Sequence, residues 1–277
     1  MSSSSSPTEV AATADAASGM FDVREFARTA RGSHRDELDL EAVRADGLTD
    51  DAAGLVRVLR DLERSTMQRM RNVLVTATHK DARVTAFLTT WAFEKFWVAD
   101  ALDAVLEAAG RPVEATEHGK IAKPRGERAE RRGPILRAIL GNIQGPSLVA
   151  AHVTAGLVDE WVSTAAYRRL ADVAHALTGF AEMVVALKQR HIDFLAEDSE
   201  RRLAASAADA KLARKILKQS VWPIGIVERP AEDRALFTRL VLAGDAGREL
   251  AADIAERVAA LPRLANMGPV VTARLAP

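Results

Sequence analysis

The sequence predicts an all-α protein built as a helical bundle. Helix-forming alanine, leucine, arginine and glutamate are abundant, whereas aromatic residues make up only 5% of the 277 residues. Apolar residues recur at the three- and four-residue spacing of a helix face, and no stretch shows the alternation of a half-buried strand. Hydrophobic residues make up 48% of the chain, which is enough to bury a sizeable core.

Capping residues and apolar spacing together predict where each helix begins and ends. Residues 1–20, rich in serine and alanine, are expected to form a disordered tail, residues 21–220 the bundle, and residues 221–277 a C-terminal helical extension. The pattern predicts helices at Phe21–Arg31, from Thr49 or Asp50 through Leu74, and at Val84–Ala109 after an Asp81 cap. Further helices are predicted from Pro146 to about Leu177 and at 180–208, 231–243 and 245–261.

Glycine, proline and charged stretches predict where the regular structure is interrupted. Thr178 and Gly179 are expected to break one helix from the next, and Pro262, Gly268 and Pro269 to end the regular structure. A polar crossover is expected at 113–133, followed by a short helix from Pro134. Its basic segment 120–132 is interpreted as a solvated loop, with a clamp for an acidic partner as the alternative.

Charge and cysteine content exclude several classes of function. The formal net charge is +0, so no nucleic-acid partner is expected. The chain has no cysteine, which excludes disulfides, zinc–thiolate sites and iron–sulfur clusters and fits a reducing, cytoplasmic location. Residues 1–20 lack the features of a signal peptide. The uncharged run 138–158 is interrupted at Gly145-Pro146, so no membrane span is expected.

Two parts of the chain repeat one arrangement of chemically active residues. Glu63 on one predicted helix is followed 31 residues later by Glu94-Lys95-Phe96-Trp97, and Glu160 is followed 28 residues later by Lys188-Gln189-Arg190-His191. Residues three apart share a helix face, so each pair can point into the same core. The sequence therefore predicts a polar site inside the bundle.

This arrangement resembles the ferritin-like di-iron carboxylate proteins, in which four helices supply two glutamates and two Glu-x-x-His motifs to a metal pair. The stretches around Trp91–Trp97, Asp159–Tyr167 and Leu187–Leu195 are similar to the acyl-carrier-protein desaturase branch. The resemblance covers roughly residues 55–203. It implies a ferritin-like four-helix bundle with a long crossover and additional C-terminal helices, a homodimer, and an apolar or acyl-carrier-bound substrate.

Carried over residue by residue, the resemblance gives an incomplete metal site. Glu63, Glu94, Glu160 and His191 fit ligand positions, while Trp97 stands in place of a histidine and Lys188 in place of a bridging glutamate. Four ligands could still hold one or two iron ions. Alternatively no metal binds, and Lys188 replaces the metal charge by pairing with the glutamates, because unpaired buried carboxylates are costly.

Several of these residues also have an ordinary structural interpretation. Glu63 could be a surface residue, His191 a core histidine with its hydrogen bonds satisfied, and one of Asp159 and Glu160 is expected to face solvent. Tyr167 is expected to be a packed tyrosine with a hydrogen-bonded hydroxyl, and a proton or radical relay is the alternative. His79, His152 and His175 are weaker candidate ligands, since none follows a glutamate by three residues.

Two functional hypotheses follow, and the sequence leaves open whether the protein is an enzyme. The first is an oxidoreductase of the desaturase or oxygenase type with an incomplete iron site at Glu63, Glu94, Glu160 and His191. The second is a metal-free, non-enzymatic structural or partner-binding protein with Lys188 inside the former site. No catalytic residue, reaction or electron donor is assigned.

Overall fold

The computed structural model describes residues 20–111 and 145–276, which are helical and contain no strand. The all-α prediction is confirmed. The predicted tail lies outside the described residues except for Met20, and so do the basic segment 120–132 and the predicted helix at Pro134. No described helix is both long and apolar enough to cross a membrane.

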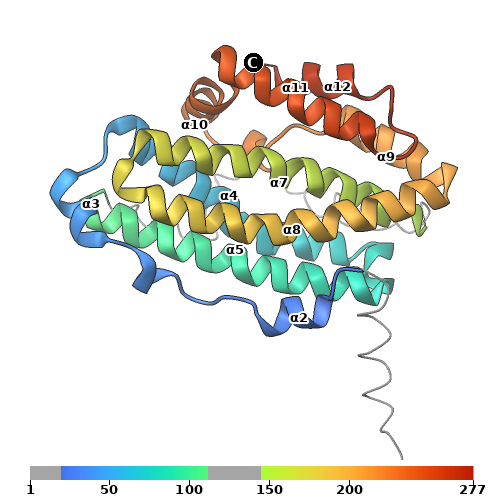
Figure 1. Ribbon diagram of the computed structural model, residues 1–277, viewed down its shortest axis with the longest axis horizontal. Coiled ribbons are helices and arrows are strands. Elements are labelled where there is room, and N and C mark those ends of the chain that lie inside the picture. Colours follow the sequence, from blue (N-terminus) through green and yellow to red (C-terminus); the bar gives the residue numbers. More distant parts are fainter. Residues whose placement is uncertain (1–19, 112–144, 277) are drawn as a thin grey trace, which may run out of the picture.

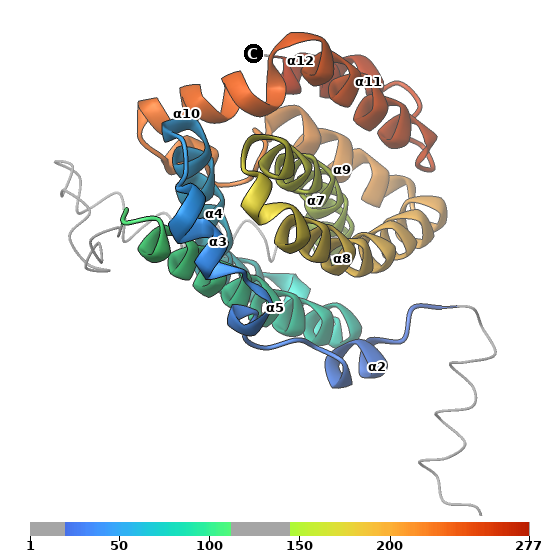
Figure 2. The same cartoon turned by 60° about the vertical axis from the view of Figure 1, so that its left-hand side comes forward.

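Four long helices run side by side and build the bundle core (Figures 1 and 2). Within it, α4 pairs with α5 and α7 pairs with α8. The caps predicted at Thr49 and Asp81 are present, with Thr49 Oγ1 accepting a hydrogen bond from the Ala52 amide and Asp81 Oδ1 from the Val84 amide. The four helices are α4 (Asp50–Leu74), α5 (Ala82–Ala108), α7 (Ser147–Val173) and α8 (Thr178–Ala205).

The junctions of α8 differ from the sequence prediction at both ends. The sequence predicts that Thr178 and Gly179 separate two helices, yet both residues lie inside α8, which begins at Thr178. The break lies earlier, because Ala174 leaves the helical region (φ −140°, ψ 84°) and a 3-10 turn, η3 (His175–Leu177), follows it. At the other end the helix predicted to reach residue 208 stops at Ala205, because Ser206 is extended and caps a separate helix, α9 (Ala207–Gln219).

The segment before α4 runs along the outside of α5 (Figure 2). It contains α2 (Val23–Arg28), the short turn η1 (Arg35–Glu37) and α3 (Leu40–Asp46), and both α2 and α3 contact α5. The helix predicted for Phe21–Arg31 is shorter, because Asp22 caps its start and it ends at Thr29. Phe26 is the one buried residue of α2, packed against the bundle.

A C-terminal layer covers one side of α7 and also packs on α4 through α10 (Figure 1). The prediction that Pro262, Gly268 and Pro269 end the regular structure is wrong, because a last helix begins at Gly268. Proline is tolerated there since the first turn needs no amide donor. The layer comprises α9, η4 (Ile226–Glu228), α10 (Ala231–Phe237), a π-helical turn η5 (Thr238–Leu242), α11 (Gly244–Ala260) and α12 (Gly268–Leu275).

Partly buried His152 on α7 makes the fold sensitive to mild acid. Burial lowers the pKa of His152 from its usual 6.5 to about 4, and its Nδ1 lies 3.0 Å from Thr78 Oγ1. The unfolded chain binds a proton there at a higher pH than the folded chain does. The contribution of neutral His152 to the free energy of unfolding is therefore complete above pH 6.5. It is lost as the pH drops toward 4, and the loss amounts to at most about 3 kcal/mol.

Urea unfolding between pH 7.5 and 4.5 measures this contribution in the wild type and in His152→Gln, which keeps a polar side chain but does not titrate. We expect a shallower fall in stability for the variant. Equal pH profiles for the two proteins would show that His152 is not responsible.

Candidate functional site

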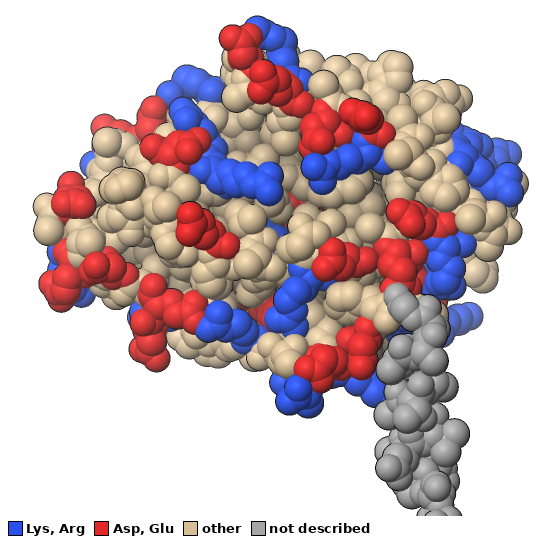
Figure 3. Space-filling model, in the orientation of Figure 1, with Lys and Arg blue, Asp and Glu red and all other residues tan. Residues whose placement is uncertain are grey.

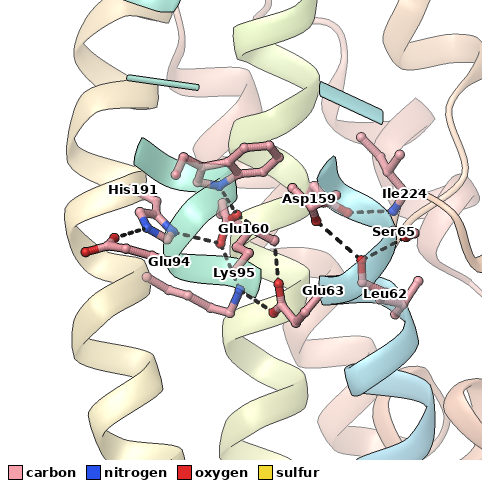
Figure 4. Close-up of polar contacts among 12 residues, drawn as sticks. Leu62, Glu63, Ser65, Glu94, Lys95, Asp159, Glu160, His191 and Ile224 are labelled. Atoms are coloured by element: carbon pink, nitrogen blue, oxygen red, sulfur yellow. Dashed lines mark hydrogen bonds and ion pairs between the residues drawn. The ribbon is translucent and has the colours of Figure 1, made fainter. Parts of the chain in front are cut away.

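Charged side chains from all four long helices meet inside the bundle (Figure 4). Glu63 comes from α4, Lys95 from α5, Glu160 from α7 and Lys188 from α8. Each is at most 3% exposed. We call these four residues the ion ring.

The two lysines alternate with the two glutamates around the ring. Lys188 Nζ lies 2.8 Å from Glu63 Oε1 and 3.1 Å from Glu160 Oε2. Lys95 Nζ lies 3.0 Å from Glu63 Oε2 and 3.0 Å from Glu160 Oε1. Both lysines donate hydrogen bonds to Glu160, whereas their contacts with Glu63 are close ion pairs. Two positive and two negative charges therefore cancel within one closed group.

Two aromatic side chains complete the surroundings of the ring. Trp91 Nε1 donates a hydrogen bond of 2.7 Å to Glu160 Oε1, and the Tyr167 hydroxyl donates one of 3.3 Å to Glu63 Oε1. The ammonium group of Lys95 lies 4.9 Å from the centre of a Trp91 ring, and that of Lys188 lies 5.3 Å from the Tyr167 ring centre. Tyr167 is thus a packed, hydrogen-bonded tyrosine.

Glu94 and His191 form a second polar group beside the ring. His191 Nε2 lies 2.8 Å from Glu94 Oε2, and His191 Nδ1 lies 3.7 Å from Glu160 Oε2. The other Glu94 oxygen accepts a hydrogen bond from the Arg31 amide and lies 3.4 Å from Arg190 Nη1. The aromatic side chain of Phe26 from α2 packs edge-on against the imidazole of His191. Glu94 is therefore balanced by its own partners and does not join the ring.

Ion pairing keeps Glu63, Glu160 and Lys95 charged despite their burial. Burial alone would raise the pKa of each glutamate, but Lys188 and Lys95 outweigh it and hold the pKa of Glu63 below, and that of Glu160 well below, its usual value. Burial alone would lower the pKa of Lys95, but Glu160 and Glu63 raise it. Burial and the nearby Glu63 raise the pKa of the Tyr167 phenol well above its usual value. Glu63, Glu160 and Lys95 therefore stay ionised at neutral pH.

The structure brings the sequence-predicted site residues together in one place. Glu63, Glu94, Glu160 and His191 are all buried, and the amine of Lys188 lies between Glu63 and Glu160. Trp97, predicted to stand at a ligand position, makes no polar contact with them. Its ring packs edge-on against Phe93 and Phe96.

Sequence reasoning missed the role of Lys95. The resemblance places Glu94 as a ligand and gives no role to Lys95, the next residue. One signal was available, since Glu94 and Lys95 are the only charged residues between Val84 and Ala99. In a helix that apolar, both charges are expected to find partners in the core.

The expectation that Asp159 or Glu160 faces solvent is wrong, because both are buried. The C-terminal layer covers the outer face of α7, and the Ile224 amide of that layer donates a hydrogen bond of 2.6 Å to Asp159 Oδ1. Burial raises the pKa of Asp159, although Lys95 and Arg69 act against that rise. Asp159 thus links the ring helix α7 to the C-terminal layer.

The residues present do not fit an iron ion between Glu63 and Glu160. A metal ion there would need the carboxylate oxygens that the two ammonium groups already contact, and it would add positive charge next to theirs. Across residues 20–111 and 145–276, no three His, Asp or Glu side chains are grouped so that they could hold one metal ion.

The fold and the site define a helical-bundle protein with an interior lysine–carboxylate ring. Comparisons with protein-family models, curated proteins and solved structures gave no significant match.

Removing one lysine of the ring is expected to destabilise the fold strongly. Lys188→Met leaves Glu63 and Glu160 sharing a single cation, and breaking a buried pair costs about 3–5 kcal/mol. Chemical denaturation measures the loss. Lys211→Met on the exposed surface of α9 is the matched control and should change stability by less than about 0.5 kcal/mol.

The double variant Glu63→Gln with Lys188→Met removes one charge of each sign. It should lose less stability than the sum of the two single variants, because each single change leaves an unmatched charge and the two changes together do not. Additive losses would show that the two side chains do not act as a pair.

Asp159→Asn is expected to stabilise the protein at pH 7. Asparagine keeps an oxygen to accept the Ile224 amide but no longer buries a charge. A raised folded pKa means that ionised Asp159 costs stability once the pH is above that pKa, so the gain should shrink as the pH falls toward 3.8. A loss of stability at pH 7 would show that the attraction to Lys95 and Arg69 outweighs the cost of burial.

Proposed function

We propose that this chain is a metal-independent helical-bundle protein that acts as a structural or partner-binding protein and not as an iron oxidoreductase. The proposal rests on one observation. Lys95 and Lys188 each contact both Glu63 and Glu160, so the two lysines supply the positive charge that a metal ion would supply in a carboxylate site.

Charge balance supports this function. Three buried glutamates need compensating charge, and the described residues contain it. Lys95 and Lys188 balance Glu63 and Glu160, while Arg190 and His191 lie against Glu94. A buried ion group is weak evidence for added stability, but its geometry has to be satisfied by particular partners. The ring therefore favours one register of α4, α5, α7 and α8 over others.

Burial of the ring also argues against a substrate reaching it. Its four side chains are at most 3% exposed, and Phe26, Tyr167 and Trp91 pack around the polar groups. An apolar or carrier-bound substrate would have to separate the helices to reach Glu160. A surface pocket among the described residues is lined by Asp50, Arg57, Arg111 and Leu236, among others. None of its lining residues belongs to the ion ring.

The oxidoreductase hypothesis makes a different demand on the same residues. Glu63, Glu94, Glu160 and His191 would have to bind iron, and both ring ammonium groups would have to leave or lose a proton. The raised pKa of Lys95 opposes that loss. Metal content therefore separates the two hypotheses directly.

The test is metal analysis and a visible spectrum of protein produced in iron-rich medium, with unfolding followed in the presence and absence of a chelator. We expect folded protein without bound iron and an unfolding temperature that the chelator does not change. Near-stoichiometric iron with a visible absorption band would overturn the proposal.

A variant without the ring lysines supplies the matched comparison. Lys95→Ala with Lys188→Ala leaves the buried carboxylates uncompensated, so a divalent cation should raise its unfolding temperature and leave that of the wild type unchanged. A wild type stabilised as much as the variant would contradict the role assigned to the lysines.

A further inference from the structure

The outer face of α9 carries only basic charge. Four basic residues follow one another at steps of three, one and three positions, which places them on one side of the helix. The three lysines are exposed, and the arginine is half-buried. The opposite side of α9 is buried, and the helix packs chiefly against α7. The α9 basic face consists of Lys211, Arg214, Lys215 and Lys218.

No carboxylate among the described residues pairs with this face. Asp209, the only acidic residue of α9, accepts a hydrogen bond of 2.6 Å from Ser147 Oγ of α7. Arg214 Nη1 donates a hydrogen bond of 2.7 Å to the Arg263 carbonyl, which is an uncharged acceptor. The face therefore keeps its full positive charge, although the formal net charge of the chain is +0.

Arg263 extends the positive charge beyond α9. Its Nε and Nη2 donate hydrogen bonds to the carbonyls of Leu203 and Ala204 at the end of α8. Its backbone lies in the left-handed region, with φ 62°, which is uncommon for a residue other than glycine. Figure 3 shows basic side chains gathered at the right-hand edge of the molecule, near the end of α8 and the start of α9. A fifth cation thus lies next to the α9 basic face.

The composition of this face favours a lipid surface as its partner. Lysine is depleted at protein–protein interfaces, where aromatic anchors fill pockets. Single-stranded nucleic acids stack their bases on aromatic side chains, and α9 has none. Clusters of about four to eight lysines and arginines on an amphipathic helix are typical of binding to anionic lipids. Val221, three residues after Lys218, is 40% exposed and offers the bilayer interface an aliphatic side chain.

We propose that the α9 basic face binds the surface of a membrane that contains anionic lipids. The ammonium groups of the three lysines lie at the level of the lipid headgroups, and their attraction to the negative charges there holds the C-terminal layer against the bilayer. From Lys211 to Lys218 the face is about 10 Å long, at 1.5 Å per residue. The contact is peripheral, and it does not depend on the ion ring or on metal.

Co-sedimentation with vesicles tests the proposal. Vesicles of phosphatidylcholine alone are compared with vesicles of equal parts phosphatidylserine and phosphatidylcholine, at low and at physiological ionic strength. We expect the wild type to bind the anionic vesicles, to be released as the salt concentration rises and to leave the neutral vesicles unbound, because salt screens attraction between exposed charges. A wild type that stays in solution, or that binds both kinds of vesicle equally, would overturn the proposal.

Neutral substitutions identify the binding surface. Each lysine near an anionic bilayer strengthens binding about fivefold, so Lys211→Gln, Lys215→Gln and Lys218→Gln together should weaken it about a hundredfold. The matched control, Arg24→Gln with Arg71→Gln and Lys80→Gln, removes three exposed cations from other elements and should weaken binding far less. Circular dichroism checks that both variants keep the helix content of the wild type. An equal loss in the two variants would show that binding follows net charge and not this face.

Soluble polyanions distinguish the other classes of partner. Duplex DNA and poly-glutamate, which stands for an acidic protein segment, are added to the vesicle-bound wild type at the same charge concentration as the lipid. We expect most of the protein to remain on the vesicles. Transfer of the protein to either polyanion would assign the face to that class of partner and overturn the proposal.

A fluorescent label reports which side of the protein meets the bilayer. The chain has no cysteine, so Ala208→Cys introduces a single thiol three residues before Lys211, on the same side of α9. A polarity-sensitive dye on that thiol should shift its emission to shorter wavelength when anionic vesicles are added. The same dye at the exposed position Ala86→Cys on α5 should not shift. A shift on α5 without one on α9 would contradict the proposed orientation.

Discussion

Two carboxylates buried on facing helices require positive charge beside them, and the bundle is arranged around this requirement. Glu63 on α4 and Glu160 on α7 are almost fully buried, and each contacts the ammonium groups of both Lys95 and Lys188. One helix contributes each charge, so a shift of any one helix along its axis would leave a buried charge without its partner. The ring thereby specifies how the helices align, even where its net contribution to stability is small.

The rest of the structure keeps water away from this group. Phe26 from α2 covers the His191 side, and the C-terminal layer covers the outer face of α7. That layer is tied to α7 by the Ile224 amide at Asp159 and by Trp222 Nε1, which donates to the Ala155 carbonyl. In the resulting low-dielectric interior, ion pairs are stronger and an unpaired charge costs more. Segments distant in sequence thus determine the electrostatics of the core.

Three consecutive residues of α5 face three different environments. Glu94 points to His191, Lys95 points to the ring, and Phe96 points outward. A helix advances about 100° per residue, so three consecutive residues can face three environments. The ring holds α5 in the bundle from inside, while Phe93 and Phe96 are exposed on its outer side.

The sequence by itself determined the all-α class and the capped starts of α4 and α5. These follow from local periodicity and capping chemistry, which depend on residues close together in the chain. The resemblance to the di-iron carboxylate pattern pointed to Glu63, Glu94, Glu160 and His191 as residues that share one site. Tertiary structure decided that Lys95 joins Lys188 between the glutamates and that Glu94 pairs apart with His191. It also decided that Asp159 is buried. Spacing along one helix gives the faces of that helix, but only the packing of the other helices decides which charges meet and which face is left to solvent.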